Sequence, residues 1–511
     1  MWVTLRRLNP RLVSFAVLAV LWVGPHLPHL AGPIDDPQSW RQCDTAQYAY
    51  SFFREGVSLL RPSVIWMGGY KTVVLEFPLP ELLMALAYRA FGFDLKFSRL
   101  VTLSFFLGSA VYLLLIVRHL FGSRLATECA AVYGILPLAL FYSRAIHIDF
   151  AAVFFGHAFT YHAMRSCDLR SPAHALFASI AGVLGCLIKA PYVFYFALPL
   201  IAYAARSPRT RVFPYLATPL ITSAAAFAIW RMHVEATNGL APDWSFIPGY
   251  IKHVDMGGWY YGPLSTRLQW SPWRELLSRT RSEVTSSWGF WLCSLGLVVS
   301  LYSWARRRAT ADDFIAAWAL GLLGYVLIFF NLNVFHDYYQ IPLLALASVL
   351  IARALDLPVQ LWGKRFPTLA LFATVLAFAL LAFKSIQWTE RYFYQVDWLR
   401  VEAGRLIEEN TPRDALVIAS TTTHTNPRDP RLLERAHRYG WSIYRDHLTP
   451  ELVERLTRFG ATHVVLVVPE DEPTTEILGR KATTLSLHES PWKLLIAHVS
   501  AQRPQAERGG R

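Results

Sequence analysis

Long apolar runs recur along this sequence, and they constrain its fold more than any other feature. Each run is about 15 to 22 residues long, the length at which a helix crosses the roughly 30 Å hydrocarbon core of a bilayer. Hydrophobic residues make up 54% of the chain and charged residues only 17%, a balance that argues against a soluble protein. We predict an α-helical polytopic membrane protein with about eleven transmembrane helices, at 12–31, 99–118, 125–143, 149–165, 173–189, 191–206, 212–231, 287–304, 313–332, 338–354 and 367–384.

Basic residues cluster beside the ends of these apolar runs. The formal charge of +13 comes from small clusters of Arg and Lys and not from one basic stripe, so it indicates membrane topology and not nucleic-acid binding. With the N-terminus inside, every short basic loop falls on the inner side, as the positive-inside rule requires. We therefore expect a multi-pass protein of the bacterial inner (cytoplasmic) membrane. The basic residues of these loops are Arg118, Arg124, Arg165, Arg170, Arg206 to Arg211, Arg306 to Arg308, Arg353, Lys364 and Arg365.

Two apolar segments have a second interpretation. The first run, with arginines ahead of it, also fits a signal peptide cleaved near Ala31, but the apolar series after it favours an uncleaved span. Residues 77–91 are about 15 residues long and contain Glu81, and counting them as a span would turn the later basic loops outward. We predict a helix lying on the outer surface there, with Pro78 and Pro80 at its start.

Hydrophilic stretches divide the chain into domains. We expect a transmembrane module at 1–384 with outer loops 32–98 and 232–286, an outer α/β domain at 385–502 and a flexible basic tail at 503–511. In the outer domain, short apolar strands alternate with helical patterns. The expected helices are 398–409, 432–437 and 450–459, and the expected strands are 415–419 and 462–468, with a further segment at 441–444.

Three carboxylates are predicted at the outer membrane face, namely Asp44, Glu76 and Asp149. A carboxylate near a hydroxyl can take its proton as the oxygen attacks an electrophilic carbon. Each carboxylate also fits a helix end: Asp44 with Gln47 as a capping box, Asp149 as an N-cap, and Glu76 beside a helix dipole. Their convergence on one face favours the catalytic interpretation.

Basic side chains near the same face can bind a phosphate, arginine as a fork and lysine as a point charge. The candidates are Arg41, Arg99, Arg144, Lys189 and His336. Lys189 also fits a lysine that snorkels to lipid headgroups. The aromatic residues between 244 and 273 are expected mainly in the interfacial belt, with stacking on sugars as the alternative. The sequence has no Gly-rich phosphate loop, dinucleotide fingerprint or His-Glu-x-x-His motif.

A series of motifs occurs in order over the first 350 residues. They are Trp40-Arg41-Gln42, Asp44-Thr45-Ala46, Glu76-Phe77-Pro78-Leu79, Ser98-Arg99-Leu100, Phe141-Tyr142-Ser143-Arg144, Asp149 and Asp337-Tyr338-Tyr339-Gln340. The series resembles bacterial C-type (GT-C) glycosyltransferases, the relatives of protein O-mannosyltransferases and of the transferase that adds aminoarabinose to lipid A. Arg438-Tyr439-Gly440-Trp441 is similar to a segment of the same relatives, and we expect a structural role for it.

The resemblance implies a GT-C fold and an inverting transfer from a polyprenyl-phosphate sugar to a lipid, glycan or protein hydroxyl outside the membrane. It implies catalytic roles for Asp44, Glu76 and Asp149, and it leaves a divalent metal ion open as a cofactor. Membrane lipids are expected partners and nucleic acid is not. The substrate-binding residues are then Trp40, Arg41, Gln42, Arg99, Arg144, Lys189, His336 and Tyr339.

Two other classes fit a polytopic chain. A transporter or lipid flippase places its ionisable groups inside the spans near the bilayer midplane. Here the acidic residues cluster in the predicted outer loops, which favours an enzyme. A membrane scaffold that only holds the outer domain would not explain why three carboxylates are expected at one membrane face.

Overall fold

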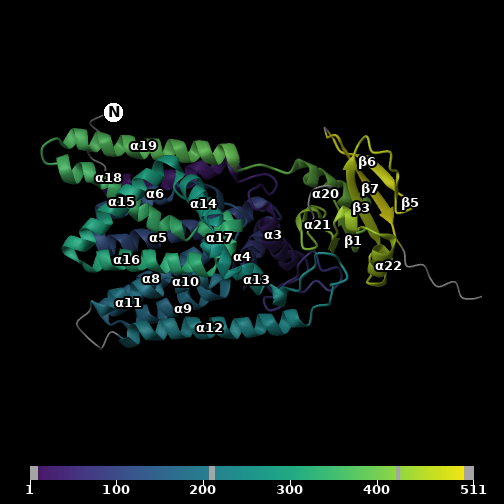
Figure 1. Cartoon of the computed structure of the whole chain (residues 1–511), viewed down its shortest axis with the longest axis horizontal. Coiled ribbons are helices and arrows are strands. Elements are labelled where there is room, and N and C mark those ends of the chain that lie inside the picture. The colour runs from purple at the N-terminus through teal and green to yellow at the C-terminus, as the bar shows by residue number, and fades with distance from the viewer. Residues whose placement is uncertain (1–9, 207–212, 422–425, 489, 500–511) are drawn as a thin grey trace, which may run out of the picture. The chain divides into compact units, whose positions relative to one another are not determined.

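The computed structural model describes residues 10–206, 213–421, 426–488 and 490–499 (Figure 1). The chain forms two compact units, each of which combines separate segments. Unit 1 contains residues 1–32, 93–233 and 257–394, and unit 2 contains residues 33–92, 234–256 and 395–511. The expected tail at 503–511 lies outside the described residues. The domain boundary expected at residue 384 stays a prediction.

Long apolar helices dominate unit 1, which confirms a mostly helical, polytopic membrane protein. In the described part of the chain, seven helices are long and apolar enough to cross a membrane, and each overlaps an expected span. They are α5 (Leu95–Phe121), α9 (Pro172–Lys189), α12 (Phe213–Gly239, whose last residues belong to unit 2), α15 (Ser286–Arg307), α16 (Thr310–Ile328), α18 (Leu343–Trp362) and α19 (Pro367–Tyr392).

The other four expected spans form shorter, broken or more polar helices. Prolines interrupt three of them, because proline lacks the N–H that continues a helix. The fourth, α8, has 21 residues but carries polar side chains such as His157 and Arg165. These elements are α2 (Pro10–Val23) with η1 (Gly24–His29), α6 (Ser123–Tyr133) with α7 (Pro137–Tyr142), α8 (Asp149–Leu169), and α10 (Pro191–Phe194) with α11 (Ala197–Ala205).

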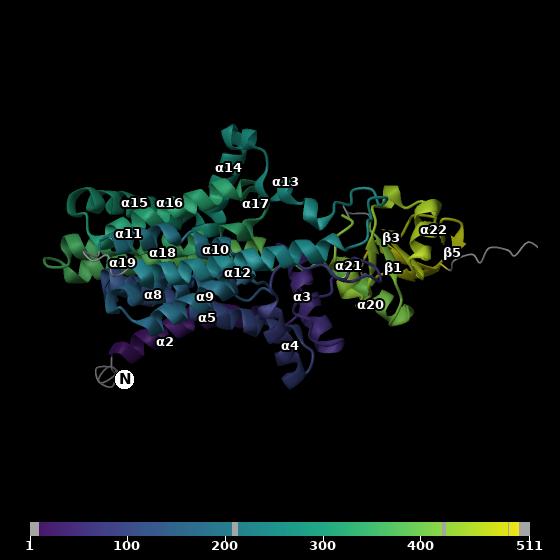
Figure 2. The same cartoon turned by 90° about the horizontal axis from the view of Figure 1, so that it is seen from below.

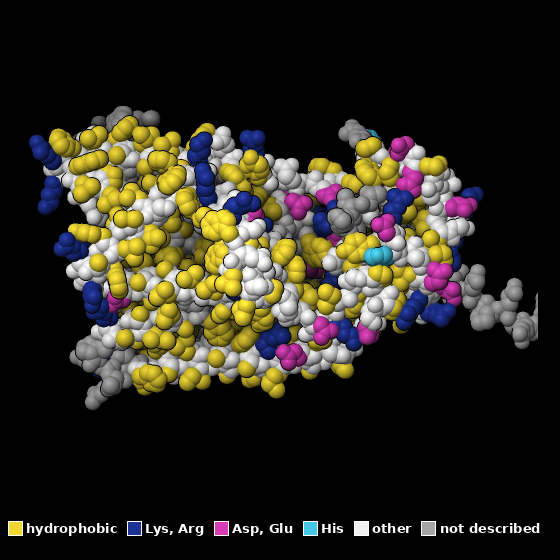
Figure 3. All heavy atoms as spheres, viewed as in Figure 1, with side chains coloured by type: hydrophobic (Ala, Val, Ile, Leu, Met, Phe, Trp, Pro, Cys, Tyr) yellow, Lys and Arg dark blue, Asp and Glu magenta, His cyan; other side chains and the backbone are white. Residues whose placement is uncertain are grey.

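Helix packing in unit 1 brings together elements that carry the candidate residues. Helix α8 packs against α5 and α9, and α15 packs against α18 (Figure 1, Figure 2). Gly296 permits the second contact, because a Cβ there would lie 1.8 Å from the Leu350 carbonyl oxygen. Hydrophobic side chains cover much of the visible face of these helices (Figure 3), as lipid contact requires.

Short elements connect the long helices of unit 1. A π-helical turn, η5, follows α14 directly, and a 3₁₀ turn, η6, precedes α18. Their bounds are α13 (Gly257–Tyr261), η4 (Leu264–Leu268), α14 (Trp270–Arg279), η5 (Thr280–Val284), α17 (Phe330–Phe335) and η6 (Asp337–Gln340).

A five-stranded mixed sheet forms the C-terminal part of unit 2, in the order β2-β1-β3-β7-β6. β1 is parallel to both neighbours, and Val417 pairs with Gly440 on one side and with His463 on the other. β7 is antiparallel to β3 and β6. The strands are β1 (Val417–Ser420), β2 (Gly440–Ser442), β3 (His463–Pro469), β6 (Thr483–Ser486) and β7 (Trp492–His498), with a separate pair β4 (Glu476–Ile477) and β5 (Arg480–Lys481).

The three helices predicted for this domain are present as α20 (Trp398–Asn410), α21 (Arg431–Arg435) and α22 (Pro450–Arg458). A short turn, η7 (Arg445–His447), follows β2. The segment 438–441 has the structural role expected of it. Arg438 is buried and donates to the main-chain oxygens of Glu408 and Thr411. A Cβ on Gly440 would lie 1.8 Å from the Val417 oxygen, so the close β1–β2 contact requires glycine.

Two helices from the first loop and part of the aromatic loop complete unit 2. They are α3 (Ser39–Arg54) and α4 (Leu79–Phe91), and the second confirms the helix expected near 77–91. Trp244 is buried in the hydrophobic core beside Trp441, with Phe246 and Tyr250 packed against it. The belt interpretation is therefore wrong for these three aromatic residues. η3 (His253–Asp255) follows them in the chain.

Candidate functional site

A buried ion pair lies in unit 1. Lys189 Nζ lies 2.8 Å from Asp149 Oδ1, and the two residues are 8% and 0% exposed. Lys189 is the last residue of α9, and Asp149 is the first of α8. The chain turns there because Pro191 cannot continue α9. The snorkelling interpretation of Lys189 is wrong, since its ammonium group is paired inside the protein.

Two further side chains contact the Asp149 carboxylate. Tyr192 donates its hydroxyl hydrogen to Oδ1, and His147 Nδ1 lies 2.6 Å from Oδ2. No side chain caps α8, whose N-cap residue is Ile148. The N-cap interpretation of Asp149 is therefore wrong, because its carboxylate binds other side chains instead of the helix N–H groups. Sequence reasoning missed Tyr192 and His147, although His147 stands two residues before Asp149.

Tyrosine rings surround Lys189. Its Nζ lies 4.0 Å from the ring centroid of Tyr339 and 4.8 Å from those of Tyr192 and Tyr338. Ring faces attract a cation electrostatically, so these contacts stabilise the ammonium group. The His336 ring stacks on Tyr338 at 5.1 Å. The structure thus brings Asp149, Lys189 and Tyr339 together, with His336 at the edge of the same cluster.

Two further acidic residues, Asp337 and Glu283, lie near this cluster. The Tyr142 hydroxyl donates to Asp337 Oδ1 at 2.8 Å. The Tyr142 ring packs edge-on against the His147 ring, with 5.4 Å between the ring centroids. Burial raises the pKa of Asp337. Burial and the charge of Asp337 raise the pKa of Glu283, in the π-helical turn, to about 8. Sequence reasoning named neither residue as functional, and a π-helical turn has no sequence signature that would have shown it.

Two predicted phosphate ligands are fully buried in unit 1. Arg99 donates through Nη1 to the main-chain oxygens of Leu30 and Gly32, at 3.0 and 2.9 Å. The Arg144 guanidinium lies 4.5 Å from the ring centroid of Tyr394. Both arginines thus hold parts of unit 1 together in this structure.

Asp44 is the centre of the candidate residues in unit 2. It lies inside α3, whose N-cap residue is Gln38, so the capping-box interpretation is wrong. Its Oδ1 accepts the indole N–H of Trp66 at 3.1 Å. Burial raises the pKa of Asp44 to about 7, although the nearby Arg41 charge and the Trp66 hydrogen bond lower it. A carboxyl group with this pKa can exchange a proton near neutral pH.

Other carboxylates lie near Asp44. Arg41 donates through Nη2 to Glu76 Oε2 at 2.7 Å, and both groups act electrostatically on Asp44. Glu81, on the first turn of α4, is 3% exposed, and burial raises its pKa to about 8. Sequence reasoning used Glu81 only to argue against a membrane span. Its position one turn into a proline-started helix gave no sign of a buried carboxyl group.

The remaining predicted ligands of the first loop have different surroundings. Gln42 is buried and donates through Nε2 to the Asp35 oxygen at 2.6 Å, which fixes the chain before α3. Trp40 is half-buried, with the Arg431 guanidinium 5.8 Å from its ring centroid. Trp40 is therefore the more accessible of the two to a ligand.

A divalent metal was left open by the sequence. Among the described residues, no three His, Cys, Asp or Glu side chains group as metal ligands. Glu76 is bound to Arg41, and Asp44 accepts an indole N–H. These two carboxylates therefore do not fit a metal site as they are arranged.

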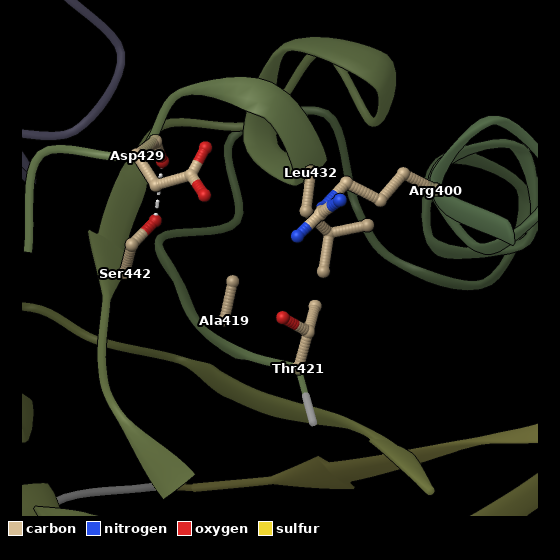
Figure 4. A pocket seen from close by; sticks show the side chains of 6 residues that line it. All are labelled: Arg400, Ala419, Thr421, Asp429, Leu432 and Ser442. Atoms are coloured by element: carbon tan, nitrogen blue, oxygen red, sulfur yellow. Dashed lines mark hydrogen bonds between the residues drawn. The ribbon is translucent and has the colours of Figure 1, made fainter. Parts of the chain in front are cut away.

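A recess in unit 2 lies at the carboxyl ends of β1 and β2, where open α/β sheets bind ligands (Figure 4). The Arg400 and Thr421 side chains face it, and Ser442 Oγ donates to the Asp429 main-chain oxygen at 2.6 Å. The recess has no room for a water-sized sphere, so it carries no ligand site as it stands.

Comparisons with known proteins agree with this fold. Residues 76–233 match the family model of dolichyl-phosphate-mannose-protein mannosyltransferase. ArnT from Cupriavidus metallidurans bound to undecaprenyl phosphate matches with a TM-score of 0.60 at 13% identity, over 97% of this chain and 99% of that chain. ArnT in the apo state matches with a TM-score of 0.57 at 14% identity, over 96% of this chain and 98% of that chain. Among curated proteins, no sequence matches the chain.

A third solved structure is more distant. AglB, the archaeal oligosaccharyltransferase from Archaeoglobus fulgidus in complex with an inhibitory peptide and a dolichol-phosphate, matches with a TM-score of 0.55 at 12% identity, over 96% of this chain and 74% of that chain. The fold is thus that of the C-type membrane glycosyltransferases, and the resemblance seen in the sequence is confirmed. Residues 76–233 are similar to the protein mannosyltransferase family, and the fold is similar to that of ArnT over nearly the whole chain.

Proposed function

We propose that this protein is an inverting glycosyltransferase that moves a sugar from a polyprenyl-phosphate donor to a hydroxyl group of a lipid, glycan or protein on the outer face of the bacterial inner membrane. The family match and the ArnT-like fold support this class of reaction. ArnT and AglB were each solved with a polyprenyl or dolichol phosphate, which supports such a lipid as the donor carrier.

The buried position of the Asp44 carboxyl group, with the Trp66 indole as its hydrogen-bond donor, is the observation that carries the proposal. As a carboxylate, Asp44 takes the proton of the acceptor hydroxyl while the oxygen attacks the anomeric carbon. The bond from that carbon to the phosphate oxygen breaks, and the electron pair leaves with the phosphate. A base is most effective when its pKa lies near the operating pH, and the pKa of Asp44 is about 7. Arg41 and Glu76 adjust this pKa through their charges.

Lys189 is assigned to the leaving group. The departing phosphate gains negative charge, and a cation fixed in advance stabilises it without reorganisation. The Asp149 carboxylate and the rings of Tyr338 and Tyr339 hold Lys189 in one place. Asp149 thus orients the lysine in this assignment and takes no proton itself.

The other predicted ligands receive supporting roles. Trp40 offers a half-buried ring on which a sugar can stack. Gln42 fixes the chain before α3 in unit 2, and Arg99 and Arg144 fix segments of unit 1. His336 orients Tyr338 and Tyr339 through ring contacts.

The proposal is tested with the purified full chain in lipid nanodiscs. Undecaprenyl phosphate should raise its unfolding temperature, and cells without the protein should accumulate a polyprenyl-phosphate sugar and lack one envelope sugar modification. Glu55→Gln, an exposed carboxylate at the end of α3, should restore that modification, whereas Asp44→Asn should not. Unchanged lipid-linked sugars and glycans, with no stabilisation by undecaprenyl phosphate, would contradict the proposal.

A further inference from the structure

An apolar cavity of about 290 Å³ lies within unit 1, between α14, α16 and α18. Its volume is near the lower end of the roughly 300–1,000 Å³ that is usual for ligand pockets, so it holds one hydrocarbon chain and not a folded peptide. The apolar side chains that line it include Leu276, Leu322, Leu323, Val326, Leu343 and Leu346.

One part of the cavity wall is polar and incompletely hydrogen-bonded. Gln340 and Asn333 both line the cavity and are 1% and 0% exposed. The Gln340 Nε2 group and the Asn333 Oδ1 atom have no hydrogen-bond partner in the protein. A buried polar group without a partner lowers the stability of the folded protein. A ligand that accepts a hydrogen bond from Gln340 and donates one to Asn333 would remove this cost.

The cavity offers no cation to a phosphate, because no charged side chain among the described residues lines it. The Thr280 hydroxyl, which also lines the cavity, lies 3.5 Å from Gln340 Oε1 and is a further uncharged polar group of this wall. The wall therefore suits an uncharged group, such as the ester, amide or hydroxyl of a fatty acyl chain.

The turn η6 connects the cavity to Lys189, the residue proposed to stabilise the departing phosphate. Tyr338 and Tyr339, whose rings contact Lys189, immediately precede Gln340 in η6. A ligand in the cavity thus has its polar end beside the turn that holds Lys189.

We propose that this cavity binds a fatty acyl chain of the acceptor, with the polar linkage of that chain at Gln340 and Asn333. The acceptor is then a lipid and not a protein. This inference rests on the proposed function and names its acceptor class. A polyprenyl chain does not satisfy the two amide groups, because it carries only hydrocarbon beyond its phosphate.

The test uses the full chain in nanodiscs that contain a phosphatidylethanolamine with a photoreactive diazirine in one acyl chain. Label should appear in the peptides that contain residues 319–326 and 340–346. Ala319→Phe fills the cavity and should lower this label about ten-fold, which corresponds to about 1.4 kcal/mol of lost binding. Leu320→Phe is the matched control, since Leu320 is exposed and does not line the cavity. Gln340→Leu should also lower the label, with little effect on the unfolding temperature.

Three results would overturn the inference. Equal label in Ala319→Phe and Leu320→Phe would mean contact with bulk membrane lipid only. Displacement of the label by undecaprenyl phosphate would mean that the donor chain occupies the cavity. Full label in Gln340→Leu would mean that the polar wall recognises nothing. Stabilisation by undecaprenyl phosphate, measured on the same samples, reports on the proposed function, so loss of label alone leaves that function standing.

Discussion

Lys189 Nζ and Asp149 Oδ1 lie 2.8 Å apart, although 40 residues of chain separate them. Removing one partner of a buried ion pair leaves an uncompensated charge, and the cost is commonly about 3–5 kcal/mol. The pair therefore fixes the start of α8 against the end of α9. It also keeps an ammonium group in place before any substrate arrives.

The role of Lys189 can be separated from its effect on stability. We expect Lys189→Met to lower kcat/KM for a polyprenyl-phosphate sugar by about 100- to 1,000-fold, because the departing phosphate loses its cation. Arg353→Met is the control, since Arg353 forms another shielded ion pair in unit 1, with Asp312 at 3.1 Å. Both variants should lower the unfolding temperature, and only Lys189→Met should lower turnover. Equal turnover in the two variants would remove Lys189 from the reaction.

Asp44→Asn tests the proposed base. The amide oxygen of asparagine can still accept the Trp66 N–H, and Asp44 does not cap α3, so we expect the variant to fold. It cannot take a proton, so kcat should fall by about 100- to 10,000-fold. Glu55→Gln makes the same chemical change on an exposed carboxylate, and its amide oxygen can still accept the Tyr439 hydroxyl hydrogen, so kcat should stay at the wild-type value. An active Asp44→Asn enzyme would leave Glu76 or Asp149 as the next candidate.

The raised pKa of Asp44 predicts two pH dependences. The carboxylate form is the base, so kcat/KM should rise with pH through an inflection near 7. Between pH 3.8 and about 7 the folded protein keeps a proton on Asp44 that the unfolded chain has lost. The unfolded state then binds fewer protons, so the free energy of unfolding falls as pH rises across this window and levels off above it.

This second dependence is measured as a difference. The free energy of unfolding of wild type minus that of Asp44→Asn should decrease from pH 4 to pH 7, because asparagine does not titrate. A difference that increases with pH would mean that the folded protein favours the carboxylate, contrary to the burial of Asp44.

The orientation in the membrane is tested with reporter fusions. A fusion after Arg307 should report the inner side, because Arg306 and Arg307 end α15 and positive residues favour the inner side. Fusions after Tyr250 and Arg428 should report the outer side. An outer signal after Arg307 would reverse the topology and would place the candidate residues on the inner face.

The helices were predictable from the sequence because a membrane span needs a long apolar run, and that pattern is local. The sequence also named Asp44, Asp149 and Lys189 as candidates, because it placed them at the expected outer face, and their roles in the reaction stay predictions. Their partners were not predicted. Trp66 contacts Asp44 across 22 positions of sequence, and Tyr192 contacts Asp149 across 43 positions. No local sequence pattern predicts contacts of this range.

The capping interpretations were wrong for a related reason. Asp44 and Asp149 are residue types that commonly cap helices, and their spacing fitted that role. The structure instead uses Asp149 to bind Lys189 and places Asp44 inside a helix. Residue type and spacing describe what a carboxylate can do, whereas burial and long-range partners determine what it does.

Unit 2 is assembled from three segments that are far apart in the sequence, and this has a consequence for how the protein is made. Trp66 and Trp244 share a hydrophobic core with Leu494 of β7, one of the last strands of the sheet. The ribosome completes the first segment while most of the chain is still unsynthesised. The first segment therefore cannot complete its native core until the end of the chain has been synthesised.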